Sequence, residues 1–306
     1  MKNLIVVLMG GISGERKISF LTGKACASAL KNKGFKVKEL DAKGSFVEKL
    51  KKLKPKLVFN ALHGKFGEDG FVQSILESLK IPYTHSGVFS SSLAMDKEIS
   101  RLIFIKNKIK VPKYFILKKN HKDEFKKRTR NKKINFPIVI KPINEGSSLG
   151  VYICKNIKQF NTNYNKLIKK YEKIIVEEYI PGKEIQVAVM GEKPLGAIEL
   201  IPKRKFYDYE AKYSTKAKTK HIMPASVTPK QYREALLLGK KAHKALGCKG
   251  ITRSEFKFFK NKFYLLEINT QPGMTKLSLV PEIANYCGIT FKDLVMWMVK
   301  DASNNR

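Results

Sequence analysis

The stretch Thr252–Gly273 reads TRSEFKFFKNKFYLLEINTQPG. This stretch is expected to form a β-hairpin built from Ile251–Phe259 and Phe263–Asn269. Side chains of a strand alternate between two faces. If the turn is centred on Asn261, two polar pairs therefore face each other on one side of the hairpin: Glu255 with Glu267, and Arg253 with Asn269.

These facing carboxylates indicate a metal site. Glu255 and Glu267 would repel each other unless a cation lies between them. Two carboxylates and the Asn269 amide oxygen form an all-oxygen ligand set, which suits Mg²⁺ bound together with substrate phosphates. The alternative is a charged, solvated face balanced by lysines, but that interpretation leaves the NTQPG turn at 269–273 without a role.

Working outward to the N-terminus, strand and helix patterns alternate over residues 1–95. Continuous apolar runs predict buried parallel strands, and stretches with helical periodicity lie between them. The expected strands are the apolar runs Leu4–Met9 and Leu57–Leu62 and the alternating segment Lys36–Leu40. The expected helices are a stretch that follows Ser13 and runs to about Lys33, Phe46–Leu53 and Gly70–Leu79. The pattern predicts an open parallel α/β domain.

From Asp96 onward the pattern changes to shorter strands and predicts α+β lobes over 96–182 and 183–306. The expected elements are helices at Lys97–Lys108, Ile157–Tyr171 and Pro229–Leu246, strands at Tyr114–Leu117, Pro137–Lys141, Val151–Cys154 and Ile174–Tyr179, and a hairpin of Glu184–Met190 with Leu195–Ile201. Two short helices close the chain. Residues 203–220 show neither period and are expected to form a lid or binding loop.

A candidate phosphate site lies in Ile138–Gly150. A buried strand ends at Lys141 and is followed by Gly146, Ser147, Ser148 and Gly150. Glycines let backbone N–H groups approach a phosphate, and the lysine supplies a positive charge. The P-loop pattern GxxxxGK[ST] does not occur in this sequence, and a glycine-serine loop alone would fit a structural turn equally well.

Two further candidates follow the first and the last buried strand of this domain. Glu15 ends the turn Met9–Glu15 (MGGISGE), which leads into a helix whose N-terminus favours an anion. These glycines do not match GxGxxG, and Glu15 could serve the helix dipole alone. His63 would lie at the carboxyl end of the sheet, where open α/β folds bind ligands, although a lone histidine is more often structural.

The composition argues against several other classes of protein: nucleic-acid-binding, zinc-binding, disulfide-bonded and membrane proteins. The formal net charge is +35, but the excess is lysine spread along the chain, which is more typical of solvated faces than of a nucleic-acid stripe. Four cysteines without a CxxC pair argue against a zinc site or disulfides and fit a reducing compartment. Because no apolar run approaches the ~20 residues of a membrane helix or resembles a signal segment, we expect a cytoplasmic protein.

Taken together, the motifs of this chain resemble those of the D-alanine–D-alanine ligase family of the ATP-grasp superfamily. The motifs, in order along nearly the whole chain, are GGISGE, ALHGKFGEDG, YTHSGVFSSSLAMDK, VIKPINEGSSLG, FYDYEAKY, GCKG, TRSEF and LLEINTQPGMTKLSLVP. Their number and order argue against chance agreement, and they outweigh the structural alternatives given above for single residues.

The resemblance implies an N-terminal α/β substrate domain followed by two ATP-grasp lobes, which hold ATP between their sheets. It implies ATP-dependent joining of two D-alanines through a D-alanyl-phosphate, for peptidoglycan precursor synthesis and the cell wall. ATP and two Mg²⁺ or Mn²⁺ ions would be the cofactors. The enzyme would be a cytoplasmic homodimer that binds neither membrane nor nucleic acid.

The resemblance also implies roles for individual residues. For the nucleotide, Lys97 and Lys141 would hold ATP phosphates, Glu177 the adenine amino group and Glu184 the ribose, with Tyr179 and Ile180 beside the base and Lys212 at the γ-phosphate. For the metals, it implies Glu255, Glu267 and Asn269. The usual residue at the first metal position is Asp rather than Glu, and Gln271 stands where a small residue is common.

For the substrates, the resemblance places the first D-alanine's ammonium at Glu15 with His63 close by. Glu15, Ser147 and Tyr213 would form a hydrogen-bonded trio that ties the loop 203–220 to the site. Arg253 and the Gly273 backbone would stabilise the tetrahedral oxyanion. Ser278 and Leu279 would receive the second D-alanine's carboxylate.

Three alternatives remain open at this point. The chain could be a D-alanine–D-lactate ligase, an ATP-grasp ligase for a different acid and amine, or a basic nucleic-acid-binding protein without catalysis. Tyr213 and the complete metal set favour D-alanine–D-alanine ligation over these three alternatives. The aromatic-basic pattern of an RNA-binding module is absent.

Overall fold

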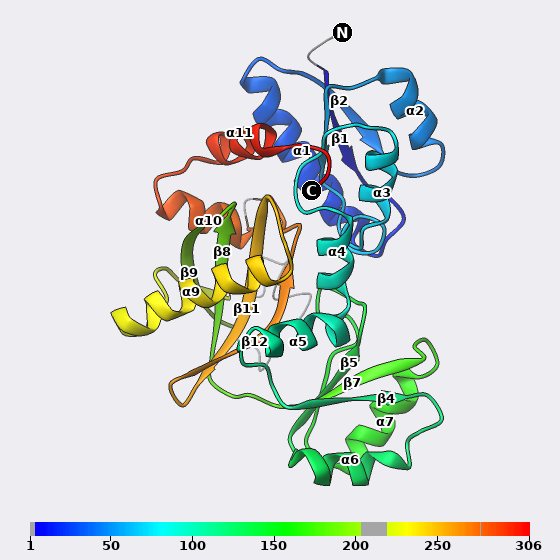
Figure 1. Cartoon of the computed structure of the whole chain (residues 1–306), viewed down its shortest axis with the longest axis vertical. Coiled ribbons are helices and arrows are strands. Elements are labelled where there is room, and N and C mark those ends of the chain that lie inside the picture. The colour runs from blue at the N-terminus through cyan, green and yellow to red at the C-terminus, as the bar shows by residue number, and fades with distance from the viewer. Residues whose placement is uncertain (1–3, 203–218, 276) are drawn as a thin grey trace.

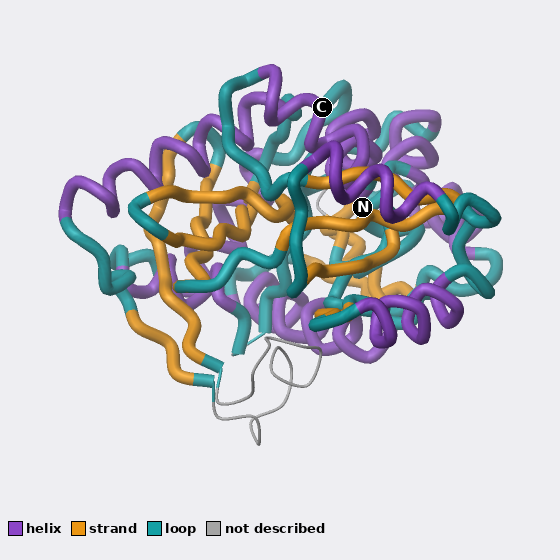
Figure 2. Tube along the Cα trace, turned by 90° about the horizontal axis from the view of Figure 1, so that it is seen from below, coloured by secondary structure: helices purple, strands orange, loops and turns teal. Residues whose placement is uncertain are grey.

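The computed structural model describes residues 4–202, 219–275 and 277–306, and these residues form three β-sheets (Figure 1). Strands run through the middle of the molecule, and helices cover them on both sides (Figure 2). The expected mixture of one parallel α/β unit and two α+β units is confirmed.

The N-terminal sheet is parallel and has the order β2-β1-β3, with β1 at Leu4–Met9, β2 at Lys36–Asp41 and β3 at Leu57–Asn60. Alternate residues of β1 enter two different cores. Ile5 and Val7 pack with Leu30 of α1 (Arg16–Asn32), whereas Val6 and Leu8 pack toward α2 (Phe46–Leu53) and α3 (Phe71–Ser78). Apolar side chains on both faces explain the continuous apolar run in the sequence.

The second sheet is antiparallel, with the order β4-β7-β5-β6, and its strands are Tyr114–Lys118, Lys173–Glu178, Ile138–Pro142 and Tyr152–Cys154 respectively. Helices α6 (Glu124–Lys132) and α7 (Ile157–Leu167) pack against it. The sequence predicted no helix at the position of α6. Phe125 of α6 is buried and stacks on Phe160 at 3.8 Å, so one aromatic residue anchors an otherwise exposed helix.

The third sheet has the order β10-β9-β8-β11-β12, with strands Lys220–Ile222, Lys193–Ile201, Lys183–Met190, Ile251–Phe259 and Lys262–Asn269. Helix α9 (Pro229–Ala245) packs on one part of it and α10 (Leu279–Tyr286) on another. The sequence showed no strand pattern in the segment 203–220, but strand β10 begins at its last residue, Lys220. The three residues of β10 pair with β9.

The β11–β12 hairpin confirms the predicted pairs but not the predicted turn. Glu255 faces Glu267 and Arg253 faces Asn269, as expected. The turn, however, has two residues, Lys260 and Asn261, both with positive φ, which is the geometry of the common tight hairpin turns. A β-bulge after Glu255 shifts the register by one residue and restores the expected pairing.

Segments far apart in the chain meet around the N-terminal sheet. Helices α4 (Val88–Met95) and α5 (Lys97–Lys106) lead from this sheet to the second one, and Asp96 caps α5 by accepting from the backbone N–H groups of the next turn. At the other end of the chain, α11 (Phe291–Asp301) packs on α1, and Ser303 forms a bridge with Tyr83. The first described residue, Leu4 of β1, and the C-terminal segment therefore both belong to this part of the molecule (Figure 1).

Candidate functional site

Two adjoining pockets lie where the three sheets meet. Pocket A, of about 890 Å³, opens beside the carboxyl ends of β1 and β3, and pocket B, of about 880 Å³, lies between the second and third sheets. Lys97, Glu145 and Glu267 line both pockets, so the boundary between them carries two carboxylates and an ammonium group.

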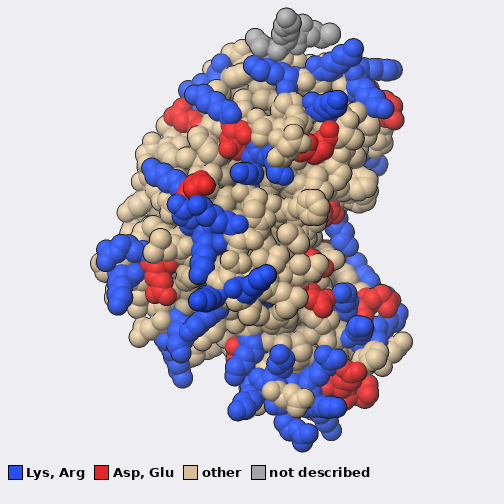
Figure 3. Space-filling view, in the orientation of Figure 1, with Lys and Arg blue, Asp and Glu red and all other residues tan. Residues whose placement is uncertain are grey.

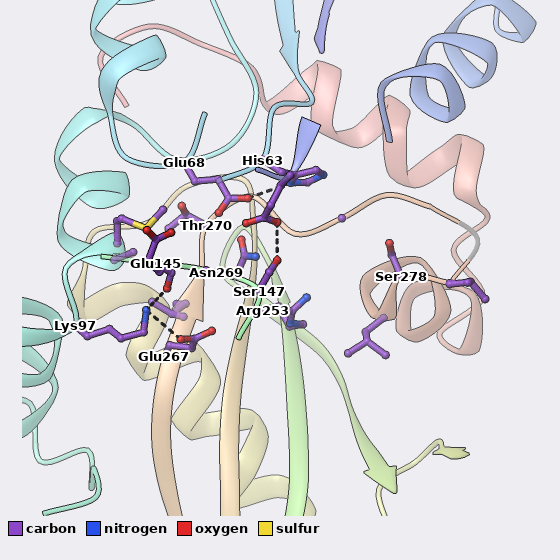
Figure 4. A pocket seen from close by; sticks show the side chains of 18 residues that line it. His63, Glu68, Lys97, Glu145, Ser147, Arg253, Glu267, Asn269, Thr270 and Ser278 are labelled. Carbon is purple, nitrogen blue, oxygen red and sulfur yellow. Dashed lines mark hydrogen bonds and ion pairs between the residues drawn. The ribbon is translucent and has the colours of Figure 1, made fainter. Parts of the chain in front are cut away.

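Glu15 reaches pocket A because of the glycine turn that follows β1. Gly10 and Gly11 have positive φ, and a Cβ at Gly10 would lie 2.5 Å from Asp41 Oδ1. Glu15 begins the helical segment after this turn and is buried. Ser147 Oγ donates a 2.6 Å hydrogen bond to Glu15 Oε2 across 132 residues of sequence (Figure 4). The structure thus brings together two members of the expected trio.

His63 lies beside this pair and is held from both sides. Its Nε2 is 2.9 Å from Thr22 Oγ1, and its Nδ1 is 3.0 Å from Glu68 Oε1. Burial raises the pKa of the Glu68 carboxyl, although the hydrogen bond with His63 acts to lower it. Sequence reasoning singled out His63 but not Glu68 or Thr22, although Glu68 is part of the same quoted motif, ALHGKFGEDG.

The opposite wall of pocket A comes from the C-terminal part of the chain. Arg253 Nε donates to Gln186 Oε1 at 3.0 Å, which fixes the guanidinium at the pocket. Gly273 packs against Ser278, since a Cβ added at Gly273 would lie 2.8 Å from Ser278 Oγ. Leu279 begins α10 and lines the same wall. Four residues of the expected oxyanion and second-substrate sites therefore share one pocket.

The residues expected to bind the nucleotide line pocket B. Lys141 Nζ lies 2.9 Å from Glu177 Oε1, and both side chains are buried. Burial lowers the pKa of Lys141, while the Glu177 charge raises it. Burial acts to raise the pKa of Glu177, but Arg101 and Lys141 hold it below its ordinary value.

The other expected nucleotide contacts lie around this pair. Tyr179, Ile180 and Glu184 line the same pocket, and Lys257 Nζ lies 3.1 Å from Glu184 Oε2. Lys97 Nζ donates to the Glu145 carbonyl at 2.6 Å and lies 3.4 Å from Glu267 Oε2. Pocket B therefore carries buried lysines of the kind that bind phosphates and buried carboxylates that can accept from a base or a ribose.

The chemistry of the expected metal ligands fits magnesium. Glu255 lines pocket B, Asn269 lines pocket A, and Glu267 lies at their boundary. All three offer oxygen, the ligand atom that Mg²⁺ prefers when it is bound together with phosphates. In the described part of the chain no group of three or more His, Cys, Asp or Glu side chains is arranged to hold a metal ion, which is compatible with a set of two carboxylates and one amide.

The expected loop 203–220, which includes Lys212 and Tyr213, lies outside the described residues except for its last two residues.

Two buried residues that the sequence did not assign to a site also support the pockets. Arg101 pairs with Glu177. Gln271, noted only for its size, accepts from Asn60 Nδ2 at 2.9 Å. The sequence alone gives no signal for the contact of Arg101 with Glu177 or of Gln271 with Asn60, because the two residues of each pair come from distant segments.

The basic side chains and the cysteines are distributed over several parts of the molecule. Lysine and arginine side chains are spread over the whole visible face rather than gathered in one stripe (Figure 3). All four cysteines are free of disulfides. Among the described residues, no helix has the length and apolar character needed to cross a bilayer.

Comparison with known proteins identifies the family. The model of the D-ala D-ala ligase C-terminus matches residues 103–300, and that of the N-terminus matches 38–86. The chain is 56% identical to the D-alanine–D-alanine ligase of Pelagibacter ubique over the full length of both, and 46% identical to that of Wolbachia pipientis wMel, with 99% of this chain and 95% of the relative covered.

Solved structures agree with the sequence relatives. The D-alanine–D-alanine ligase of Bacillus anthracis superimposes with a TM-score of 0.88 at 31% identity, and its complex with ATP with a TM-score of 0.85 at 28% identity. Each match covers 98% of this chain and 97% of the other. The arrangement of sheets around a shared cleft is that of the ATP-grasp enzymes. Within that class, this chain belongs to the D-alanine–D-alanine ligase family.

Proposed function

We propose that this protein is a cytoplasmic ligase that joins two D-alanines at the expense of ATP, through a D-alanyl-phosphate, to supply D-alanyl-D-alanine for peptidoglycan precursors. The observation that carries the proposal is that pockets A and B adjoin, with Lys97 and Glu267 in the walls of both. An anchored carboxylate for an amino acid and a buried lysine-rich pocket for a nucleotide thereby share one boundary, where phosphoryl transfer would occur.

Glu15 would bind the ammonium group of the first D-alanine, because the buried carboxylate is held in place by Ser147. His63, buried nearby between Thr22 and Glu68, would shape this end of the pocket. The carboxylate of the bound D-alanine would then attack the γ-phosphoryl group of ATP, forming the acyl-phosphate and releasing ADP.

In pocket B, Lys141 and Lys97 would hold ATP phosphates, and Glu177 the adenine amino group. Tyr179 and Ile180 would contact the base, and Glu184 the ribose. Lys212 is proposed to reach the γ-phosphate. The support for these roles is the position of the residues. Lys97 lies at the boundary between the two pockets, and the other five described residues line pocket B and not pocket A: Lys141, Glu177, Tyr179, Ile180 and Glu184.

Glu255, Glu267 and Asn269 would hold two Mg²⁺ or Mn²⁺ ions. Such ions, when bound, offset negative charge on phosphate oxygens during transfer. Glu255, where the family pattern usually has Asp, lies opposite Glu267 on the neighbouring strand. Its longer side chain would still offer carboxylate oxygens to an ion.

In the second half-reaction, the amine of the second D-alanine would attack the carbonyl carbon of the acyl-phosphate. The C–N bond forms, the C–O bond to phosphate breaks, and inorganic phosphate leaves. Arg253 and the Gly273 backbone N–H would stabilise the oxyanion, and Ser278 and Leu279 would receive the second carboxylate. Tyr213 is proposed to complete the trio with Glu15 and Ser147, so Tyr213→Phe should slow peptide formation about tenfold.

The proposal includes a homodimer. Helices α3 and α4 pack together, and three phenylalanines of this region are exposed: Phe66, Phe71 and Phe89, the last to 81%. Phe66 and Phe71 contact each other edge to face at 5.0 Å. Clustered exposed aromatic side chains are typical of contact surfaces, so light scattering of Phe71→Ser with Phe89→Ser should report a smaller particle than the wild type.

A phosphate-release assay with a panel of D-amino acids and D-lactate tests the activity. With ATP, Mg²⁺ and D-alanine, we expect dipeptide, ADP and phosphate in equal amounts, with L-alanine a poor substitute. Preference for D-lactate would favour the depsipeptide ligase. No product with any acid, together with tight and salt-sensitive RNA binding, would favour the nucleic-acid-binding alternative.

A further inference from the structure

Arg101 is a fully buried arginine directly behind pocket B. It lies one turn after Lys97 on α5, and its side chain is 0% exposed. Among the described residues it does not line the pocket, but one of its terminal nitrogens donates to Glu177 Oε2. Burying a guanidinium is costly unless it is paired, so its position calls for an explanation.

The Glu177 carboxylate is shared between two cations. Its Oε2 accepts from Arg101, and its Oε1 lies 2.9 Å from Lys141 Nζ. An arginine fork would usually engage both oxygens of a carboxylate, but here the second oxygen faces the lysine. The three groups together carry one positive charge in excess, which favours an anion in the adjoining pocket.

The guanidinium is held in place by the sheet. It lies over the Tyr114 ring at 4.9 Å from the centroid, and Tyr114 is the cross-strand partner of Glu177. Within the described part of the chain its Nε and Nη1 have no hydrogen-bond partner, so contact with the ring is the compensation that the site offers. Arg101, Tyr114 and Glu177 therefore form a fixed stack behind the pocket wall.

The charge state of Glu177 decides what it can recognise. An ionised carboxylate only accepts hydrogen bonds, whereas a protonated one can also donate. Burial alone acts to raise the pKa of Glu177, and the charges of Arg101 and Lys141 both act to lower it. Arginine keeps its own proton under all ordinary conditions, so its effect on the carboxylate does not vary with pH. Lys141, by contrast, is also proposed to bind a phosphate of ATP, so it does not serve Glu177 alone.

We propose that Arg101 is a positioning residue for the nucleotide base: it holds the Glu177 carboxylate as an acceptor against the base and so sets the preference for a 6-amino purine nucleotide over a 6-oxo purine nucleotide. A 6-amino group donates to this carboxylate, whereas a 6-oxo group would face it with a second acceptor. The inference rests on the proposed role of Glu177 in binding the base.

The test measures kcat and KM for ATP and for GTP in purified variants. Arg101→Met and Arg101→Gln remove the charge by two different side chains, and Arg101→Lys keeps it. In each neutral variant that folds, KM for ATP should rise about tenfold, the ratio of kcat/KM for ATP to that for GTP should fall about tenfold, and kcat should change little. Arg101→Lys should restore most of the preference for ATP.

The pH dependence supplies a readout that a merely structural role would not move. In the neutral variants the preference for ATP should decline toward the acid end of the activity range, because Glu177 is then protonated more readily, whereas in the wild type it should stay constant. Arg128→Met, which removes an exposed arginine paired with Glu124 on α6, is the matched control and should leave both nucleotides unaffected.

Glu177→Gln separates this inference from the function on which it rests. If Glu177→Gln leaves the ATP to GTP ratio unchanged, the proposed base contact of Glu177 is wrong. If Glu177→Gln lowers the ratio but a folded neutral Arg101 variant keeps the wild-type ratio and KM, the role of Arg101 is wrong while the role of Glu177 stands.

Discussion

Glu255 on β11 lies directly opposite Glu267 on β12, although the two-residue turn of their hairpin would otherwise pair Glu255 with Leu266. The β-bulge makes the difference, since a shift of one residue moves every side chain of a strand to the other face. Without it, Glu255 and Glu267 would project from opposite faces of the sheet. The bulge therefore creates the proposed metal site, and Leu266, the extra residue, lines pocket B.

We expect Glu267→Gln to lower the rate of phosphoryl transfer by at least about 100-fold while the protein still folds. The substitution keeps the shape of the side chain but removes a proposed ligand charge and the partner of Lys97 at 3.4 Å. The measurements are ADP formation and the far-ultraviolet circular dichroism spectrum. Glu192→Gln, an exposed glutamate paired with Lys244, is the control and should keep wild-type turnover.

Thermal unfolding tests the same residue independently of activity. With ADP present, removing Mg²⁺ should lower the melting temperature of the wild type more than that of Glu267→Gln, because a ligand that binds only the folded state stabilises it. Equal shifts in the two proteins, or wild-type turnover in the variant, would refute the paired-carboxylate site.

Ser147→Ala should weaken binding of the first D-alanine. The substitution removes the 2.6 Å hydrogen bond to Glu15, and a hydrogen bond to a charged group contributes about 1.5–3 kcal/mol, so KM for that D-alanine should rise roughly 10- to 100-fold. KM for ATP should change much less. Steady-state kinetics on both substrates decide this, with Ser78→Ala, on exposed α3 surface, as the control. A D-alanine KM equal to that of the wild type would contradict the role of Ser147.

Much of the fold follows from local patterns in the sequence. The continuous apolar run of β1 predicted a strand buried on both faces, and the hairpin expected over 251–269 predicted the pairing of Glu255 with Glu267. The pairing was obtained with a turn centred on Asn261, and the structure reaches it through a tighter turn and a bulge. Because the turn was placed on Asn261 alone, the pairing of Glu255 with Glu267 came out right without the extra residue Leu266 being identified.

Contacts between distant segments were beyond the reach of those patterns. Helix α6 has one buried apolar residue, Phe125, so it lacks the apolar stripe that identifies a helix in sequence. Arg101 lies 76 residues from Glu177 and Gln271 lies 211 from Asn60. Each is one polar residue in a helix or a turn, and only the assembled sheets place its partner next to it.

His243 should make the protein less stable in acid. It is buried on α9 with its Nδ1 2.8 Å from Thr252 Oγ1, and burial lowers the pKa of His243 to about 4. The unfolded chain therefore binds a proton that the folded protein excludes, and stability is lost as pH falls from about 6.5 toward 4. Between about pH 7.5 and pH 5, the wild type should lose about 2 kcal/mol more than His243→Asn in urea unfolding. Identical losses would contradict this role of His243.

Gln271 should couple the N-terminal sheet to the loop that follows β12. It is 1% exposed, accepts from Asn60 Nδ2 at 2.9 Å, and donates to the Leu62 carbonyl at the end of β3. Its own backbone N–H donates to Asn269 Oδ1 at 2.7 Å, so the same residue orients a proposed metal ligand. Gln271→Ala leaves buried polar groups without a partner and should lower the free energy of unfolding by about 1–3 kcal/mol.

A double-mutant cycle isolates this contact, because Asn60 also donates to the Gly67 carbonyl and accepts from the backbone N–H of Leu62. Asn60→Ala alone should therefore cost more than Gln271→Ala. Once Asn60 is alanine, Gln271→Ala should cost less by a coupling energy of about 0.5–3 kcal/mol. The backbone N–H that donates to Asn269 remains in Gln271→Ala, but the loop that carries it loses its side-chain contacts with Asn60 and Leu62, so the Mg²⁺ concentration for half-maximal activity should also rise. Strictly additive stabilities, with an unchanged Mg²⁺ requirement, would show that Gln271 only fills space between the sheet and the loop.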